Sequence, residues 1–326
     1  MLLRYRTHLT AMLLLLALLV TMPLLSSCGG PEPTTPSTPA PAPAPAAVVE
    51  FDVVKAAVAD YLVGPSGNMK PEDLQIKIAE NNSPYIVSIR SAEDYAAGHI
   101  PGAMNMKFGE LSTVPMDQDI VVYCYTGQSA SFGTAVLGIQ GYSVMNLRHG
   151  MSSWSDDSEV YKKRYSGAAG YDTETTPNIG GSYAMPTLEN TSSNDDAAII
   201  AAAAATVSPK YISAKDLQVK ISEGEAMTIL SVRKADAYAV GHIPGAINAP
   251  YGPNIVSALS QLDPDAPVYV YCYTGHTAAQ STAMLQMLGY DAYSVSFGMC
   301  GWSDNPDVTK GACFTPEMSK GYDIEK

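Results

Sequence analysis

The stretch Cys124-Tyr125-Thr126-Gly127-Gln128-Ser129 is the most informative part of this chain, because a similar stretch occurs again as Cys272-Tyr273-Thr274-Gly275-His276-Thr277. Each copy follows a short apolar run and precedes a segment with helical spacing, residues 130–141 in one case and 278–289 in the other. These patterns predict that each cysteine lies where a buried strand ends and a helix is about to begin.

A cysteine at such a place is suited to act as a nucleophile. The first turn of a helix carries unpaired backbone N–H groups and the positive end of the helix dipole. Both favour the thiolate, which is the nucleophilic form of cysteine. Gly127 and Gly275 allow each loop to curl with its amides pointing inward, which suits an anionic sulfur species. A buried and inert cysteine is the alternative, and it is less favoured because the same context occurs twice.

The region around the two loops is duplicated as a whole. A passage that runs from Arg90 to Gly98-His99-Ile100-Pro101-Gly102-Ala103 returns from Arg233 to Gly241-His242-Ile243-Pro244-Gly245-Ala246. Two copies with so long a period indicate a tandem domain duplication. Short apolar strands alternate with helical segments in each copy, which predicts an α/β fold with a parallel sheet covered by helices on both faces. Ligands bind such sheets at the carboxyl ends of strands, where both cysteines fall.

The order of the motifs resembles that of the rhodanese (sulfurtransferase) family. The resemblance rests on Gly-His-Ile-Pro-Gly-Ala, the later Tyr-Cys-Tyr-Thr-Gly loop, a Gly-Tyr pair at 141–142 and 289–290, and Trp154 or Trp302. It covers nearly all of residues 70–155 and 213–303. It implies two tandem rhodanese domains, each a five-stranded parallel sheet flanked by helices.

The resemblance also implies an activity. Members of the family take a sulfane sulfur from thiosulfate or a related donor onto the loop cysteine as a persulfide, and pass it to a thiophilic acceptor such as cyanide or a thiol. Carried over, Cys124 and Cys272 are the catalytic nucleophiles, and no metal or cofactor is expected. The other loop residues are then expected to bind substrate: Tyr125, Thr126, Gly127, Gln128, Ser129, Tyr273, Thr274, Gly275, His276 and Thr277.

Two further functions remain open beside catalysis. A non-catalytic sulfur-carrier or sulfur-sensing module would also keep the fold, and the loops favour it to some extent because they lack the arginine or lysine that many members use to hold an anionic donor. Phosphate-ester or arsenate chemistry is disfavoured, because the loop is one residue shorter than the related dual-specificity phosphatases require and no arginine follows it. Ser88 and Ser231 also depart from the aspartate that many members carry two residues before the family arginine.

Several residues near the loops have simpler interpretations. His99 and His242 are interpreted as structural residues that tie loops together, and the tryptophans as packing residues. Arg90 with Glu93, and Arg233 with Asp236, are expected to form local ion pairs. His276 differs because it lies in the loop itself, where its imidazole could titrate near neutrality and is a candidate for substrate contact.

The N-terminus predicts export. Residues 1–28 combine Arg4 and Arg6 with an apolar run at 11–20 that is too short to span a membrane, as in a secretory signal. Leu25-Ser26-Ser27-Cys28 resembles a bacterial lipobox, so we expect Cys28 to be acylated and to anchor the protein outside the cytoplasmic membrane. An ordinary cleaved signal is the alternative. Residues 29–47 are Pro-rich and predict a semi-rigid spacer.

The remaining boundaries and cysteines follow from composition. We predict a first rhodanese domain at 48–175, a linker rich in Pro, Gly, Ser and Asn at 176–193, and a second domain at 194–326. Two further cysteines, Cys300 and Cys313, match no common zinc spacing. In an exported protein they are expected to form a disulfide, although Cys300 could instead resolve a persulfide on Cys272.

The charge restricts the partners. The formal net charge is −13, which disfavours binding to nucleic acid or to an anionic membrane surface. The expected partner is a small sulfur-containing anion or a thiol, held locally by loop amides, with membrane contact through the lipid anchor only.

Overall fold

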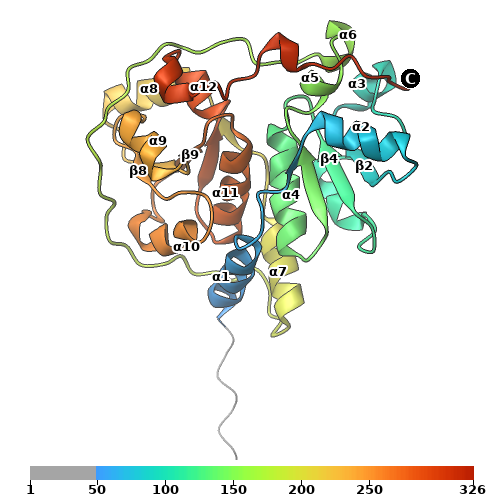
Figure 1. Cartoon of the computed structure of the whole chain (residues 1–326). Coiled ribbons are helices and arrows are strands. Elements are labelled where there is room, and N and C mark those ends of the chain that lie inside the picture. Colours follow the sequence, from blue (N-terminus) through green and yellow to red (C-terminus); the bar gives the residue numbers. More distant parts are fainter. Residues whose placement is uncertain (1–48) are drawn as a thin grey trace, which may run out of the picture. The chain divides into compact units, whose positions relative to one another are not determined.

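Two parallel β-sheets, one from each copy of the repeat, organise the structure (Figure 1). The structure is a computed structural model that describes residues 49–326. The predicted signal peptide, the lipobox cysteine Cys28 and the linker 29–47 lie outside these residues. No helix within the described part of the chain is long and apolar enough to cross a membrane.

The first domain comprises the elements from α1 to α6, and the second those from α7 to η3. The elements of the first domain are α1 (Glu50–Tyr61), β1 (Asn68–Met69), α2 (Pro71–Ala79), β2 (Tyr85–Ser88), α3 (Ala92–Ala97), β3 (Met104–Asn105), η1 (Phe108–Thr113), β4 (Ile120–Tyr123), α4 (Gln128–Ile139), β5 (Val144–Leu147), α5 (Met151–Trp154) and α6 (Ser158–Tyr161). Those of the second are α7 (Asp196–Ala205), β6 (Tyr211–Ile212), α8 (Ala214–Glu223), β7 (Thr228–Ser231), α9 (Ala235–Val240), β8 (Ile247–Asn248), α10 (Asn254–Ala258), η2 (Leu259–Gln261), β9 (Val268–Tyr271), α11 (His276–Met287), β10 (Ala292–Val295), α12 (Gly298–Trp302), α13 (Pro306–Thr309) and η3 (Pro316–Met318).

The two sheets have the same topology, and it confirms the predicted fold class. The strand order is β1-β5-β4-β2-β3 in the first domain and β6-β10-β9-β7-β8 in the second. Every pair of neighbouring strands is parallel. Strands β4 and β9, which lead into the two cysteine loops, are central and wholly buried. Their continuous apolar sequences fit strands that are covered on both faces.

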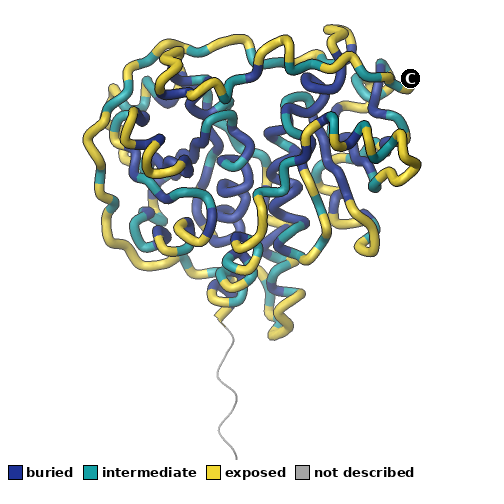
Figure 2. Tube along the Cα trace, viewed as in Figure 1, coloured by how far each residue is buried: buried dark blue, intermediate teal, exposed yellow. Residues whose placement is uncertain are grey.

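Helices α4 and α11 pack against each other and join the two domains into one core. Almost every residue of both helices is buried, as Figure 2 shows. Their sequences carry small and apolar residues on all sides, which is typical of a helix without a solvent face. The buried hydroxyls of Ser131 and Thr282 bond to carbonyls of Gly127 and Ala278 in the preceding turn, so that burial leaves them satisfied.

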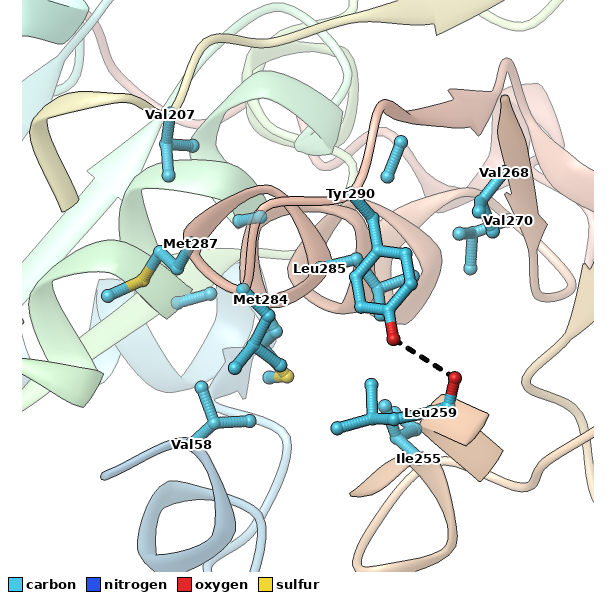
Figure 3. Close-up of a cluster of buried hydrophobic side chains, with 14 of the residues drawn as sticks. Val58, Val207, Ile255, Leu259, Val268, Val270, Met284, Leu285, Met287 and Tyr290 are labelled. Atoms are coloured by element: carbon cyan, nitrogen blue, oxygen red, sulfur yellow. Dashed lines mark hydrogen bonds between the residues drawn. The ribbon is translucent and has the colours of Figure 1, made fainter. Parts of the chain in front are cut away.

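The shared core extends to the helix at the start of each domain. Val58 of α1 and Val207 beyond α7 lie around Met284 and Met287 of α11 in one hydrophobic cluster (Figure 3). At the edge of that cluster, the Tyr290 hydroxyl donates a hydrogen bond to a backbone carbonyl at 3.0 Å. Because side chains of both domains fill a single cluster, the described residues 49–326 belong to one compact unit.

Each domain also binds a segment that follows the other domain's helices. Trp302 of the second domain donates its indole N–H to the Asp172 carbonyl at 2.8 Å, within the connecting arm (residues 169–174). Trp154 of the first domain donates to the Asp323 carbonyl at 2.9 Å, within the C-terminal arm (residues 319–325). The residues at the predicted end of the first domain therefore pack on the second domain, although the boundary at 175 stays a prediction.

The two arms end in equivalent contacts with the structural histidines. Backbone hydrogen bonds join Glu174 to His242 and Glu325 to His99 in both directions. The Nδ1 atoms of His99 and His242 lie 3.0 and 2.9 Å from the carbonyls of Tyr95 and Tyr238, and each ring stacks on that tyrosine. These contacts agree with the interpretation that both histidines tie loops together.

The predicted ion pairs of the two buried arginines are not formed. Arg90 donates to the carbonyls of Val160 and Gly98, and Arg233 donates to those of Val308 and Gly241. Both guanidinium groups point inward under the end of the sheet, where carbonyl oxygens rather than the exposed carboxylates lie within reach.

A disulfide joins Cys300 of α12 to Cys313 beyond α13. The first domain has Ser152 at the position of Cys300, where its hydroxyl donates to the carbonyls of Tyr125 or Lys163. At this equivalent position, a serine hydroxyl forms hydrogen bonds in the first domain, and a cysteine forms a covalent bond in the second.

We expect the Cys300→Ser, Cys313→Ser double variant to have a free energy of unfolding lower by about 3 kcal/mol, because the unfolded chain regains the freedom of the closed loop. Urea denaturation without reductant measures the difference. Reductant should abolish it by lowering the stability of the parent protein, and equal stability of the two oxidised proteins would contradict the prediction.

Candidate active site

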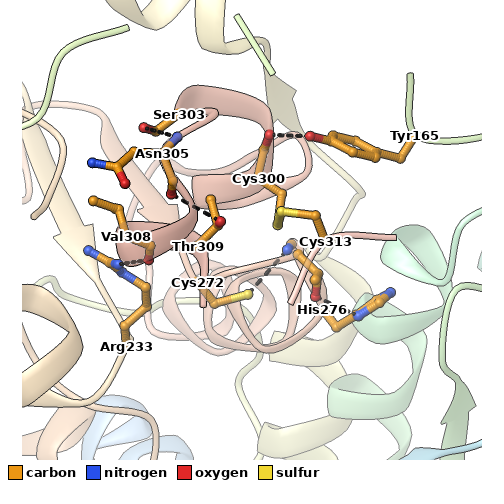
Figure 4. The surroundings of a disulfide bond; sticks show 12 residues. Tyr165, Arg233, Cys272, His276, Cys300, Ser303, Asn305, Val308, Thr309 and Cys313 are labelled. Carbon is orange, nitrogen blue, oxygen red and sulfur yellow. Dashed lines mark hydrogen bonds between the residues drawn. A yellow bond between two sulfur atoms is a disulfide. The ribbon is translucent and has the colours of Figure 1, made fainter. Parts of the chain in front are cut away.

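Both loop cysteines lie at the carboxyl edge of their sheets, directly after the central strands β4 and β9. Cys124 and Cys272 are free thiols and both are buried. The backbone N–H of Gly275 donates to the Cys272 sulfur at 3.1 Å (Figure 4). Charge-assisted hydrogen bonds of this kind stabilise a sulfur anion, so the Gly275 amide supplies at Cys272 the kind of contact that the sequence predicted.

A glycine in the left-handed conformation starts each helix. Gly127 has φ +80° and Gly275 has φ +88°, and each is the N-cap of its helix. Any other residue would be strained there. The turn lets α4 and α11 begin two residues earlier than the helical spacing predicted, at Gln128 and His276. The fifth loop residue therefore belongs to the helix.

The two loops contact each other across the domain interface. His276 Nε2 lies 3.0 Å from the carbonyl of Thr126 in the first loop, and its Nδ1 lies 2.9 Å from the Thr274 hydroxyl. In the opposite direction, Gln128 accepts a hydrogen bond from the Phe297 N–H at 2.8 Å. The loop positions that differ between the copies thus make the contacts that join the domains.

His276 does not titrate near neutrality, contrary to the prediction. The pKa of His276 is lowered to about 4, chiefly by burial; the bond to the Thr126 carbonyl opposes this shift, and the positive charge of Arg148 adds to it. The ring is 4% exposed, so an imidazolium there would lose its hydration. The sequence does not reveal this burial, because the residues that contact the ring, Thr126 and His149, belong to the other domain.

His149 extends the contact around His276. Its ring centroid lies 4.9 Å from that of His276 and 5.1 Å from that of Phe314. Burial, together with the charges of His276 and Arg148, lowers its pKa to about 2. Both histidines are therefore neutral at the centre of the interface, and neither is placed to donate a proton from an imidazolium at neutral pH.

The surroundings of the two cysteines differ. A pocket of about 440 Å³ opens beside Cys272, lined by Ser66, Asn68, Lys70, Arg148, Val232, Arg233, Lys234, Cys272, Tyr273, Thr274, His276, Thr277 and Ala312. Beside the first loop, the hydroxyl of Tyr211 from the second domain lies 2.9 Å from the Ser129 hydroxyl. Burial, and secondarily the Cys124 sulfur, raises the pKa of Tyr211, so it stays a neutral phenol.

The predicted substrate-binding residues are therefore divided between two places. Tyr273, Thr274, His276 and Thr277 line the pocket of Cys272, whereas Gln128 is buried in the interface. Tyr125 bonds through its hydroxyl to the Asp94 carboxylate, and Arg233 lies over the ring of Tyr273. Their contact with substrate stays a prediction.

Sequence reasoning did not find the pocket residues Lys70, Arg148 and Lys234. One signal was present for Arg148, which directly follows strand β5 and so lies at the carboxyl edge of the first sheet. The sequence does not show that this edge faces the cysteine of the other domain. Within residues 49–326, no group of three His, Cys, Asp or Glu side chains is arranged to hold a metal ion.

Known proteins resemble both copies of the repeat. A family model described as the rhodanese-like domain matches residues 70–157 and 213–305. A sulfurtransferase of Allochromatium vinosum is 34% identical over 89 residues, which cover 26% of this chain and 83% of that protein. The thiosulfate sulfurtransferase GlpE of Shewanella oneidensis is 30% identical over 96 residues, covering 29% of this chain and 93% of that protein.

The chain also resembles solved structures. A rhodanese-like domain protein from Staphylococcus aureus is 30% identical, with coverage of 29% of this chain and 93% of that chain and a TM-score of 0.28. The two sulfurtransferases match a stretch of about the length of one copy of the repeat, and they support sulfur transfer as the general activity.

The burial of His276 predicts a pH-dependent stability. The unfolded chain takes up a proton near pH 6.5, whereas the folded protein resists protonation down to about pH 4. Acid therefore favours unfolding across that interval. Replacing His276 with Gln, the residue of the other loop, should reduce the loss of unfolding free energy between about pH 7 and about pH 5 by about 2 kcal/mol. Urea denaturation at both pH values measures it, and parallel pH dependences of variant and parent would contradict it.

Proposed function

Because this chain belongs to the rhodanese-like domain family, we propose that it is an exported sulfurtransferase that moves sulfane sulfur from thiosulfate or a related donor to a thiophilic acceptor. The observation that carries the proposal is the Gly275 N–H bond to the Cys272 sulfur at the start of a helix. Retention of a cysteine at the same place in both loops supports catalysis further. The name of the Shewanella oneidensis relative supports thiosulfate as the donor.

The chemistry requires two displacements at sulfur. In the first, the cysteine thiolate attacks the outer sulfur of thiosulfate, the S–S bond of the donor breaks, and sulfite leaves with the electron pair. In the second, the carbon of cyanide attacks the terminal persulfide sulfur, the enzyme S–S bond breaks, and thiocyanate leaves the regenerated thiolate. Neither step needs a general base once the thiol is ionised, which agrees with two neutral histidines at the interface.

The role of the loop is to stabilise sulfur anions in both steps. The N–H of Gly275 faces the sulfur, and the positive end of the α11 dipole lies behind it. The same loop in the first domain supplies a second cysteine, and we propose that Cys124 also carries a persulfide. A sulfur carrier that never turns over is the alternative, and the low exposure of both thiols favours it in part.

Cysteine variants test the catalytic roles. We expect Cys124→Ser and Cys272→Ser each to retain part of the cyanide-dependent release of thiocyanate, and the double variant to retain none. Mass spectrometry of loop peptides after exposure to thiosulfate should find one added sulfur on each cysteine. Full activity of the double variant would refute the assignment, and a persulfide without thiocyanate release would favour the carrier.

We also propose that lipid on Cys28 holds the protein outside the cytoplasmic membrane. The acidic chain, with a net charge of −13, offers little attraction for an anionic surface, so the anchor is the attachment. The spacer 29–47 would extend roughly 50–60 Å as polyproline, which is enough to clear the lipid headgroups.

A single substitution tests the anchor. Cys28→Ala should abolish lipid modification and lipoprotein processing while leaving the sulfurtransferase domains folded, because residue 28 lies outside both domains. Fractionation and the mass of the mature protein report the result. Membrane attachment as firm as that of the parent, in a protein whose signal has been removed, would show that the lipobox interpretation is wrong.

A further inference from the structure

Four cationic residues line the pocket beside Cys272, and they come from both domains. Lys70 and Arg148 belong to the first domain, and Arg233 and Lys234 to the second. The guanidinium of Arg233 is occupied by two backbone carbonyls, as Figure 4 shows in part. The other three differ: among residues 49–326, none of the six lysine–carboxylate ion pairs and neither of the two histidine–glutamate contacts includes them.

We propose that Lys70 and Arg148 of the first domain, together with Lys234, form the site that binds the anionic sulfur donor of Cys272. This inference rests on the proposed sulfur transfer and adds the residues that select the donor. It also replaces the expectation that loop amides alone capture the anion. The cations that the loops lack are supplied by segments distant in the sequence, at the mouth of the same pocket.

Unpaired cations in a partly enclosed pocket suit a donor such as thiosulfate. Arg148 is half-buried and Lys70 is exposed, so the pocket combines a planar guanidinium with a more accessible ammonium. A guanidinium matches the oxygens of an oxyanion in pairs, whereas an ammonium acts as a point charge. Because the chain as a whole is acidic and repels anions, a local cluster of this kind is needed to hold one.

The same cations would assist the step in which sulfur is transferred. As the Cys272 thiolate attacks the outer sulfur, the negative charge of the donor concentrates on the departing sulfite. Cations that contact the oxygens of that group stabilise the leaving group and hold its outer sulfur toward the thiolate. Fixed charges that face developing charge in an enclosed site lower the barrier without reorganisation.

The site around Cys124 provides an internal comparison, because a serine stands at the position equivalent to each of the three unpaired cations. Ser213 precedes α8 as Lys70 precedes α2, and Ser296 follows β10 as Arg148 follows β5. Ser91 follows Arg90 as Lys234 follows Arg233.

The pocket wall differs as well. Tyr211 opens strand β6, as Asn68 opens β1, and its hydroxyl reaches the Ser129 hydroxyl of the first loop. A bulky phenol therefore lies where the pocket of Cys272 has a smaller amide. The anion site is consequently built at Cys272 and not at Cys124.

Alkylation by reagents of different charge tests the site without requiring turnover. In a Cys124→Ser background, the rates at which iodoacetate and iodoacetamide alkylate Cys272 are compared, and peptide mass spectrometry locates the label. We expect Lys70→Ser and Arg148→Ser together to lower the iodoacetate rate about tenfold and to leave the iodoacetamide rate nearly unchanged. Lys77→Ser, which removes a cation of the adjoining helix α2 that does not line the pocket, is the matched control and should change neither rate.

The reciprocal change and the donor itself complete the test. In a Cys272→Ser background, Ser213→Lys with Ser296→Arg should raise the preference of Cys124 for iodoacetate. Thiosulfate should protect Cys272 from iodoacetamide, at higher concentrations in the double serine variant than in the parent.

The outcomes separate the two proposals. An unchanged ratio of the two alkylation rates in the Lys70→Ser, Arg148→Ser variant overturns the anion site. If that ratio falls as expected but thiosulfate loads no sulfur onto Cys272, the anion site stands and the proposed sulfurtransferase function fails.

Discussion

The burial of helices α4 and α11 against each other is the contact on which the rest of the structure depends. Each helix starts from a cysteine loop, so the contact that builds the hydrophobic core also sets the positions of both candidate sites. The helices can pack together because their surfaces carry small residues, and because their buried hydroxyls donate hydrogen bonds to carbonyls one turn earlier in the chain. Their first residues, Gln128 and His276, then reach the opposite domain.

Two similar domains have acquired different surroundings through this contact. The pseudo-equivalent positions around the two cysteines hold Lys70, Arg148 and Lys234 on one side and only serines on the other. The disulfide Cys300–Cys313 is found in the second domain alone. Ala312, which lies beside Cys313 within the segment closed by the disulfide, lines the pocket of Cys272. The disulfide therefore also constrains part of the wall of that pocket.

The sequence predicted most local features and missed those that depend on how the domains pack. The exceptions among the local features are the ion pairs expected of Arg90 and Arg233, which bond to backbone carbonyls instead. The fold class, the position of Cys124 and Cys272 at strand ends, and the glycine turns follow from patterns within a few residues. The pKa of His276 does not, because its burial comes from the first domain. Arg148 is similar: its place after a strand is visible in the sequence, but its proximity to a cysteine of the other sheet is produced by packing.

The connecting arm and the C-terminal arm have a consequence for the order in which the two domains acquire all their contacts during synthesis. The indole N–H of Trp154 donates to the carbonyl of Asp323, a residue 169 positions later in the chain. The indole N–H of Trp302 donates instead to the carbonyl of Asp172, which is synthesised long before Trp302. The first domain emerges earlier from the ribosome but remains without its arm until the second has been translated. The domain that is synthesised first is thus the last to bind its arm.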